Sequence, residues 1–543
     1  MNSLASIHKC AGRLFMALAA ITSLLLLGAC GSSSSSSGNQ VGFSNSSLNG
    51  TYVFSSTGTD SNGGFVALAG AITADGNGHI TGGNVDVVDL SAGWGSGAAT
   101  GGYTVGADGR GQFSVAVANV QTFKFNFVLS STSHGLVTEF DTFGSGSGTM
   151  DLQTALTGIS QLANPYALSL AGVNSSGSAP VASAGSITFN SSGVSTAGIQ
   201  DFNENGLPLI NRALSGTATL GTGTAPGTMV LDDALGNGST FDFYPIDSTH
   251  FKVIETDLTN AFLAGDFYTQ AGAAIPVGQV VFTMAGGTAN LFPTVLGGYA
   301  TTDANGNFTN GSADLNQQGT FVTSNPFSGS ASSGGAVGGR VLVAVTGLPN
   351  AAEWVLYPTT SAGLIILQID SDNVTLGAAY AQSATSFAAT QNYGLNLTGY
   401  NISAGAEVDD TVQFLTASPS SSPNMTGLID ENAEGLQFTQ GAKFSGTYTP
   451  DPSPTGRGNI LAPSLNTVNG GLGLEYYVVD NTTTLFIEGG NGDTAQVGVG
   501  SFLQQTSPTS QVALKHPVVA LFHSTSHAHG AAKPGQKWTP QNK

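Results

Sequence analysis

The heptapeptide Tyr52-Val-Phe-Ser-Ser-Thr-Gly58 has three counterparts further along the chain, which begin at Tyr166, Val280 and Tyr393. The four copies stand 114, 114 and 113 residues apart. Apolar residues mixed with small polar ones in such short runs are typical of β-strands. Because a pattern that returns at a fixed long period indicates a repeated structural unit, the 543-residue chain is predicted to be a tandem array.

Three further landmarks return in the same order and at a similar period. They are a Gly-x-x-Asp motif, a strand of small residues and a closing glutamine. The motif ends at Asp86, Asp201, Asp314 and Asp430, the small-residue strand covers residues 100–104, 215–219, 328–332 and 445–449, and the glutamines are Gln153, Gln270, Gln382 and Gln504. This agreement predicts four units, at residues 48–160, 161–274, 275–386 and 387–506.

Strands account for most of each predicted unit. In the first unit, we expect them near 51–57, 64–74, 78–89, 98–107, 111–118, 122–131, 134–141 and 146–153. The run Phe123-Lys-Phe-Asn-Phe127 alternates at period two, which places three aromatic rings on one face of a strand. Eight short antiparallel strands per unit predict an all-β fold of four small barrels or sandwiches. The alternative is a β-propeller with two blades per unit.

Composition narrows the class of protein. With 13 Lys+Arg against 33 Asp+Glu, the net charge is −20, and only 8% of residues are charged. Nucleic-acid binding is excluded, because it needs clustered basic residues. Helical bundles are disfavoured as well, because they need abundant Glu, Lys and Leu at helical spacing. The two cysteines, Cys10 and Cys30, leave no thiol in the repeats for a disulfide, a zinc site or a nucleophile.

The first thirty residues form an export signal. Lys9 and Arg13 precede an apolar run, residues 14–27, which is too short to cross a bilayer as a mature helix. The ending Leu27-Gly-Ala-Cys30 resembles the lipobox of bacterial lipoproteins. This resemblance implies that residues 1–29 are removed and that Cys30 is acylated, which anchors the protein to a membrane of the bacterial cell envelope. Gly31 after the cysteine implies the outer membrane or the cell surface.

Flexible sequence flanks the repeats on both sides. Residues 30–47 contain a run of six serines and predict a flexible tether that spans roughly 20–25 Å. Residues 507–543 form a basic tail without acidic residues. In its strand number and glycine-rich turns, each unit between them resembles the avidin-like and lipocalin-like barrels.

Acidic motifs are the first candidate sites. The stretches that begin at Asp201, Asp314 and Asp430 resemble the opening half of an EF-hand loop, with Asn203 and Asn205 at ligand spacing. The bidentate glutamate of the twelfth position is missing, however, because Arg212, Asn325 and Gly441 stand there. We therefore predict loops in which these side chains cap backbone N–H groups, and no metal site or cofactor.

Other polar groups give weaker patterns. Carboxylates and a glutamine recur near the seventh strand of each unit, at Glu139, Asp141, Glu255, Asp257, Gln368, Asp370 and Glu488. A catalytic pair is needed once, so this repetition favours a structural role. His134 and His250 are predicted to be exposed in turns. In the tail, His523, His527 and His529 have the spacing of a weak transition-metal site, although a metal-free tail is favoured.

The sequence therefore predicts an exported, lipid-anchored scaffold or binding protein without catalytic residues. Tandem units suit a repetitive partner, such as a polysaccharide, or another cell-surface protein. Two alternatives remain, which are a small-molecule carrier that uses the barrel interiors and a cell-envelope hydrolase. Hydrolase signatures of the Gly-x-Ser-x-Gly and His-Glu-x-x-His types are missing from the sequence.

Overall fold

The computed structural model describes residues 42–233, 238–289, 291–333, 338–351, 353–361, 363–386, 388, 390–416, 424–462, 472–489, 496–506 and 537–538. Cys30, His523, His527 and His529 lie outside these residues. The helical elements of the described part are two 3-10 turns, η1 (Asn45–Ser47) and η2 (Ile159–Leu162). No helix in this part has the length and apolar character that a membrane crossing requires.

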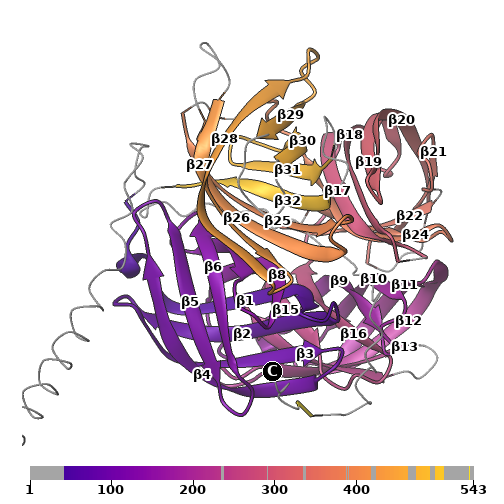
Figure 1. Ribbon diagram of the computed structural model, residues 1–543. Helices are drawn as coiled ribbons and strands as arrows, with labels where there is room; N and C mark the ends of the chain where they lie inside the picture. Colours follow the sequence, from indigo (N-terminus) through magenta and orange to yellow (C-terminus); the bar gives the residue numbers. More distant parts are fainter. Residues whose placement is uncertain are drawn as a thin grey trace, which may run out of the picture. The chain divides into compact units, whose positions relative to one another are not determined.

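The strands form four closed barrels of eight antiparallel strands each (Figure 1). This confirms the predicted all-β fold of four eight-stranded units. It also selects barrels over sandwiches and excludes the propeller, because the last strand of every unit pairs with the first strand of the same unit. The closing pairs are Tyr52 with Leu152, Tyr166 with Thr269, Val280 with Ala381 and Tyr393 with Gln504.

The first two barrels contain β1 to β16. Barrel 1 consists of β1 (Asn49–Asp60), β2 (Phe65–Asp75), β3 (His79–Asp89), β4 (Gly93–Val105), β5 (Arg110–Val117), β6 (Thr122–Leu129), β7 (His134–Glu139) and β8 (Gly144–Leu152). Barrel 2 consists of β9 (Pro165–Asn174), β10 (Pro180–Phe189), β11 (Ser195–Glu204), β12 (Leu207–Thr219), β13 (Gly227–Asp233), β14 (Gly238–Pro245), β15 (His250–Glu255) and β16 (Ala261–Thr269).

The last two barrels repeat the same order with β17 to β32. Barrel 3 consists of β17 (Gly278–Thr288), β18 (Pro293–Thr302), β19 (Phe308–Gln317), β20 (Thr320–Ser333), β21 (Val341–Thr346), β22 (Glu353–Pro358), β23 (Leu364–Gln368) and β24 (Asn373–Ala381). Barrel 4 consists of β25 (Asn392–Asn401), β26 (Ala406–Thr416), β27 (Asn424–Ala433), β28 (Gln437–Pro450), β29 (Arg457–Ala462), β30 (Leu472–Val478), β31 (Thr483–Glu488) and β32 (Gln496–Gln504).

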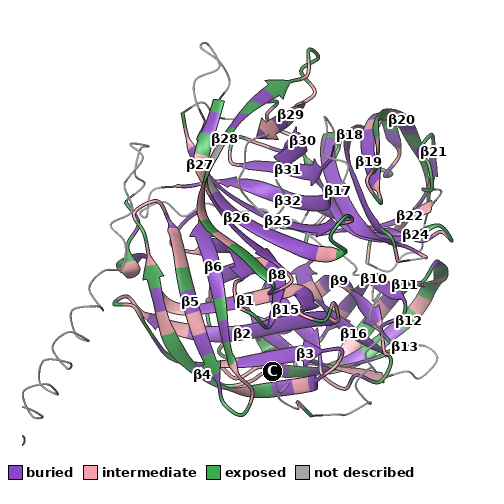
Figure 2. Ribbon diagram, viewed as in Figure 1, coloured by how far each residue is buried: buried purple, intermediate pink, exposed green. Residues whose placement is uncertain are grey.

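Alternation at period two fills the barrel interiors with apolar side chains. In β6, Phe123, Phe125 and Phe127 are at most 1% exposed, as predicted, whereas Thr122 and Lys124 face solvent. The Phe125 ring stacks on Phe113 with ring centroids 4.7 Å apart. Burial at about 25 cal/mol per Å² of apolar surface makes such an interior the main stabilising term of each barrel. The alternating pattern is visible along β4 and β5 (Figure 2).

Glycine lets neighbouring strands approach closely where each barrel closes. At Gly148 in β8, a Cβ atom would lie 1.8 Å from the Ser55 carbonyl oxygen of β1. Any other residue would therefore force the two strands apart. This close approach is a physical use for the high glycine content, 76 residues.

Turn chemistry follows the sequence prediction. In the turn between β2 and β3, Gly76 and Gly78 have φ angles of 79° and 104°, which L side chains rarely adopt. The Asp75 carboxylate accepts hydrogen bonds from the backbone N–H groups of Asn77 and His79, at 2.7 and 3.0 Å. These bonds, with the one from His79 the larger contribution, lower the pKa of Asp75 to about 2.

A short piece of the C-terminal tail lies against barrel 1. The backbone N–H of Trp538 donates to the backbone carbonyl oxygen of Trp94 at 2.5 Å. The ring centroids of Trp538 and Phe143 are 5.8 Å apart. Trp538 therefore extends the apolar cluster of the first barrel.

Candidate functional site

The repeated acidic motif lies where one barrel contacts the next, and we call each such contact a seam. Asp201 stands in β11 of barrel 2, and Arg340 of barrel 3 donates to its two carboxylate oxygens at 2.6 and 2.7 Å. The Tyr357 hydroxyl of barrel 3 donates to the same carboxylate. Asp201 is fully buried and Arg340 is 4% exposed, so the pair is held out of water. Burial first, and the charge of Asp201 second, raise the pKa of Tyr357 well above its usual value.

Barrels 3 and 4 repeat this arrangement. Asp314 in β19 accepts hydrogen bonds from the Arg457 guanidinium at 2.7 and 3.0 Å, and also from the Tyr477 hydroxyl. The fourth barrel then contacts the first, because Asp430 in β27 accepts a hydrogen bond from Arg110 of barrel 1 at 3.2 Å. The seams therefore connect the barrels in a closed cycle.

The seam between barrels 1 and 2 has a different composition. Asp86 in β3 accepts a hydrogen bond from Tyr244 of barrel 2 at 2.6 Å. Pro226 stands where the other barrels carry the arginine. Burial, followed by the nearby charge of Asp242, raises the pKa of Asp86 to about 7. This seam therefore replaces the ion pair with neighbouring carboxyl groups, and burial favours the protonated form of each.

Asparagines two residues after the aspartates form a second layer in three of the seams. The Asn203 side-chain amide donates to three backbone carbonyls of barrel 3, those of Gln368, Asp370 and Asn373, at 3.0 to 3.1 Å. Asn316 and Asn432 make corresponding bonds to barrels 4 and 1. Barrel 1 has Val88 at this position, which packs in an apolar cluster shared with barrel 2.

The closing glutamines form a third layer, which is present in all four seams. Their side-chain amides donate to backbone carbonyls of the neighbouring barrel at 2.7 to 3.0 Å. The donors are Gln153, Gln270, Gln382 and Gln505. Strand pairing aligns Gln504 with Leu152, so the expected landmark in the fourth unit is wrong by one residue and Gln505 takes the role.

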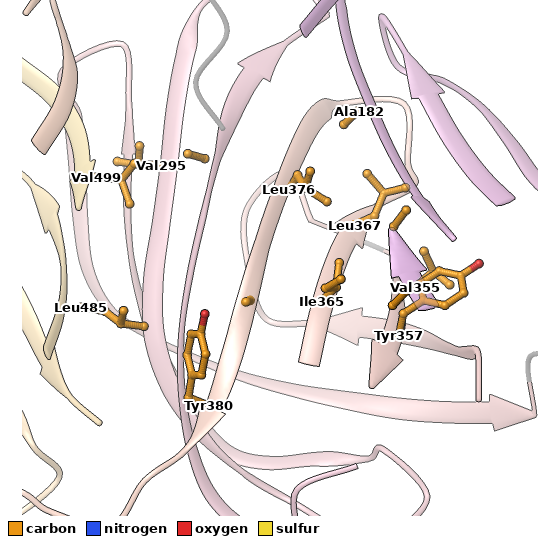
Figure 3. Packing of buried hydrophobic residues seen from close by; sticks show 14 of the residues in the cluster. Ala182, Val295, Val355, Tyr357, Ile365, Leu367, Leu376, Tyr380, Leu485 and Val499 are labelled. Atoms are coloured by element: carbon orange, nitrogen blue, oxygen red, sulfur yellow. The ribbon is translucent and has the colours of Figure 1, made fainter. Parts of the chain in front are cut away.

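Apolar side chains fill the space beside these polar layers. One cluster joins barrels 2, 3 and 4, and it contains Tyr357 and Tyr380 with Leu485 and Val499 (Figure 3). Among the described residues, the cluster between barrels 4 and 1 consists of Val128, Leu136 and Leu503. Val128 replaces the tyrosine of the other seams.

Several buried carboxylates lie at the seam between barrels 4 and 1. Asp409 accepts hydrogen bonds from the hydroxyls of Ser145 and Ser147, the latter at 2.8 Å. Burial, only partly offset by these bonds, raises the pKa of Asp409 to about 6. Burial and neighbouring acids also raise the pKa values of Glu139 and Glu407 well above the usual range. Barrels 4 and 1, which stand at the two ends of the array, thus meet at buried carboxyl groups. These groups are either protonated or ionised at a cost in stability.

The candidate ligands of the sequence analysis lie in these seams rather than in loops. Asp201 and Asn203 belong to β11, Asp314 to β19 and Asp430 to β27, so the loop prediction is wrong. Asp201 pairs with Ala184 of β10, and Ala184 packs in the apolar cluster shared with barrel 3, so this face of the strand lies against the next barrel. The predicted capping is present, because Asp201 also accepts the Asn211 N–H at 2.7 Å. Asn205 forms the following turn with a φ of 53°.

Metal ligation is not supported by this geometry. Asp201 and Asp314 are bound by arginines, which compete with any cation. No group of three His, Cys, Asp or Glu side chains in the described ranges is arranged to hold a metal ion.

The aspartates of the second acidic set cap turns, whereas Glu139, Glu255 and Glu488 are buried at the ends of strands. Asp141 follows β7 rather than belonging to it, so it does not share a strand face with Glu139. Its carboxylate accepts the N–H groups of Lys124 and Phe143, each at 2.7 Å. Asp257 accepts the Thr240 N–H at 2.6 Å in the same way. These aspartates therefore organise turns, in agreement with the structural role predicted from their repetition.

The expected exposure of the two histidines is wrong. His134 is 3% exposed and His250 is 4% exposed. Each begins a strand and pairs with a carboxylate, Asp151 and Asp266 respectively, at 2.7 Å. The turn lies one residue earlier than the sequence suggested.

Sequence reasoning missed the arginines and tyrosines of the seams. A signal was present, because Gly109-Arg110, Gly339-Arg340 and Gly456-Arg457 each begin a strand after a glycine turn. Aligning the repeats at this dipeptide would have marked the three arginines as equivalent positions, although not their partners.

Comparisons with known proteins add little. No protein-family model and no curated protein matches the chain. Among solved structures, transferrin binding protein B of Neisseria meningitidis is 10% identical, with a TM-score of 0.20, over 69% of this chain and 84% of that chain. A variant of the same protein from Haemophilus parasuis is 9% identical, with a TM-score of 0.18, over 69% and 83%. CghA in complex with Sch210972 is 9% identical, with a TM-score of 0.14, over 84% and 89%. Likeness at these levels supports no conclusion about function.

Proposed function

We propose that this chain is an exported, lipid-anchored scaffold or binding protein that acts at the bacterial cell surface without catalysis. One observation carries the proposal. The fourth strand of every barrel exposes a ladder of hydroxyl groups, formed by Thr100 and Thr104 on β4, Ser215, Thr217 and Thr219 on β12, Ser328, Ser330 and Ser332 on β20, and Ser445, Thr447 and Thr449 on β28. Four similar polar surfaces on one chain suit a partner that is itself repetitive.

The repeated acidic groups support a scaffold over a hydrolase. The aspartates of the Gly-x-x-Asp motif hold neighbouring barrels together, and Asp141 and Asp257 cap turns. The carboxylates of Asp201, Asp314 and Asp430, and those of Asp141 and Asp257, are therefore occupied by protein donors. The barrel interiors likewise favour a scaffold over a carrier, because clusters of buried apolar side chains occupy them.

A binding experiment tests the proposed partner. We expect the full-length chain to bind surface polymers on a glycan array and to raise adhesion of the cells that display it. Absence of binding to every polysaccharide and to intact cells would contradict the binding role.

Labelling with palmitate tests the anchor at Cys30. We expect the full-length chain to incorporate radiolabelled palmitate, and the Cys30→Ala variant to lose the label and the membrane association, because the acyl chains provide stable anchoring. Cys10→Ala is the matched control and should reduce neither. Continued labelling of Cys30→Ala would rule out the proposed lipidation site.

A further inference from the structure

A polar hollow lies on the outer face of barrel 1, and we call it the β4–β6 hollow. It has a volume of about 470 Å³, and the side chains of Thr104, Gln112, Ser114, Lys124, Asn126 and Phe140 line it. Strand pairing places Thr104, Gln112 and Asn126 side by side across β4, β5 and β6. The Gln112 amide donates to the Asn126 side-chain oxygen at 2.8 Å, which fixes the orientation of both amides. The hollow therefore presents Thr104 and Gln112, and the buried Asn126, which is 1% exposed, holds the Gln112 amide in place.

The corresponding positions of the other barrels differ. Gln112 stands two residues after the seam arginine, and the same position is Leu342 in barrel 3 and Asn459 in barrel 4. The residues paired with them, Val355 and Glu475, correspond to Asn126. Leu342 and Val355 pack in the apolar cluster between barrels, and Glu475 forms an ion pair with Arg457 at 3.0 Å. In barrels 3 and 4, side chains at these positions thus make packing or ion-pair contacts within the protein.

Barrel 2 has Thr228 and Asp242 at this place, and they are hydrogen-bonded to each other at 3.2 Å. Asp242 also lies beside Asp86, within the seam to barrel 1. Barrel 1 alone among the four combines two amides with an ammonium group at this position of the outer face, as far as the described residues show.

Lys124 gives the hollow a cationic contact. It is exposed, and no ion pair to a described carboxylate involves it. The nearby Asp141 carboxylate instead accepts the backbone N–H groups of Lys124 and Phe143. Arg212 and Lys443 also lack an ion pair among the described residues, so Lys124 is distinguished by its place in the hollow. A negatively charged group of a ligand would complement it.

The Phe140 ring lies at one margin of the hollow. The Phe140 ring contacts the Phe438 ring of barrel 4 edge-to-face, with centroids 5.2 Å apart, and Phe438 is 40% exposed. Sugar rings have an apolar face of C–H groups and a rim of hydroxyls. Exposed aromatic rings next to amides and hydroxyls match both parts of such a ligand.

We propose that the β4–β6 hollow binds a glycan strand that carries carboxylate groups, such as a uronic-acid polymer. Lys124 pairs with the carboxylate, Gln112 binds sugar hydroxyls, and the phenylalanine margin packs against a sugar ring. This inference rests on the proposed binding function and names its ligand class and its site.

Affinity electrophoresis of the full-length chain in native gels tests the proposal. One gel contains polygalacturonate, and a second contains its methyl-esterified form, which has the same sugars without the charge. We expect retardation by polygalacturonate that weakens as salt is raised, and much less by the ester. Equal retardation in both gels would overturn the role of the carboxylate.

Variants locate the site on the chain. The double variant Gln112→Ala and Lys124→Ala should weaken the apparent affinity about tenfold or more, because a charge-assisted contact and an amide contact are lost together. Thr228→Ala, at the corresponding place of barrel 2, is the matched control and should bind as the wild type does. Lys124→Arg should retain most of the affinity, which separates loss of charge from misfolding.

The outcomes distinguish this inference from the proposed function. A double variant that binds as tightly as the wild type would overturn the site but leave glycan binding intact. If the wild-type chain does not bind polygalacturonate, the proposed ligand class is wrong. The adhesion assay would still test the scaffold role. Loss of adhesion as well would remove the proposed function itself.

Discussion

Asp201 and Asp86 occupy equivalent positions in consecutive barrels, but different side chains surround them. Asp201 is fully buried against Arg340, whereas Asp86 faces Tyr244 and Asp242. A buried ion pair stabilises little overall, because desolvation offsets most of the attraction. Removing one partner is costly, however, because the remaining charge is then buried without compensation.

Replacing Arg340 alone should therefore lower the free energy of unfolding much more than replacing Asp201 and Arg340 together. We expect Arg340→Met to destabilise the seam between barrels 2 and 3 by about 3–5 kcal/mol. Urea unfolding followed by tryptophan fluorescence measures this, since Trp354 is buried inside barrel 3.

Two controls accompany this measurement. The double variant Asp201→Leu and Arg340→Met should recover part of the lost stability, since no unpaired charge remains, although the Tyr357 hydroxyl and the Asn211 N–H lose their acceptor. Lys443→Ala, at an exposed position of β28, should change little. A single variant as stable as the wild type would show that Asp201 is not held by Arg340.

At the scale of the elements, each barrel ends in a strand whose next residue reaches the neighbouring barrel. Gln505 follows β32 and donates to the Asp108 and Leu129 carbonyls of barrel 1, each at 2.8 Å. Gln504 instead bonds to the Gln391 side chain at 3.0 Å, within its own barrel. Two adjacent glutamines thus have different roles because the strand register, rather than the residue type, decides which one faces the seam.

These neighbours provide a matched pair of variants. We expect Gln505→Ala to cost about 1–3 kcal/mol, because two carbonyls near the seam lose their donor, and Gln504→Ala to cost less than about 1 kcal/mol. Hydrogen exchange with mass spectrometry should show faster exchange around residues 106–130 in the first variant only. Equal exchange in both variants would contradict the assignment of the seam to Gln505.

At the scale of the whole molecule, the seam between barrels 4 and 1 differs from the other three. The chain links barrels 1 to 2, 2 to 3 and 3 to 4, but barrels 4 and 1 meet only through noncovalent contacts. This seam has a small apolar cluster and a group of buried acids, including Glu139, Glu407 and Asp409. Asp60 and Asp89 of barrel 1 face Glu139 as well, and Glu434 of barrel 4 faces Asp60.

This acidic seam predicts stability that falls as pH rises. Below about pH 4, these carboxyls are protonated in the folded and unfolded states alike, so their burial costs least. As pH rises, the unfolded state ionises first, because burial raises the folded pKa of Asp409 to about 6 and of Glu434 to about 7. Stability should therefore decrease between about pH 4 and pH 7.

Melting temperatures measured across this pH range test the prediction. Asp409→Asn should flatten the decrease, by an amount on the order of 3 kcal/mol, since one shifted carboxyl is removed. Asp75→Asn is the control of opposite sign, because backbone hydrogen bonds lower the pKa of Asp75 to about 2, so its contribution is present above pH 4 and lost in acid. A wild-type profile that rises from pH 4 to pH 7 would contradict the prediction.

The sequence by itself determined the repeat, the strands and the turns. These features depend on residues that are near one another in the chain, such as the alternation of Phe123 to Phe127 and the Asp75 turn. It also marked Asp201, Asp314 and Asp430 as equivalent positions.

Only the tertiary structure decided what those positions do. Arg340 lies 139 residues beyond Asp201, and their contact follows from barrel closure and from the packing of barrel 2 against barrel 3. Burial, which moves the carboxyl pKa values and selects Gln505 over Gln504, likewise arises from the packing of one barrel against the next. Local patterns cannot specify such contacts, because the partner belongs to another unit of the repeat.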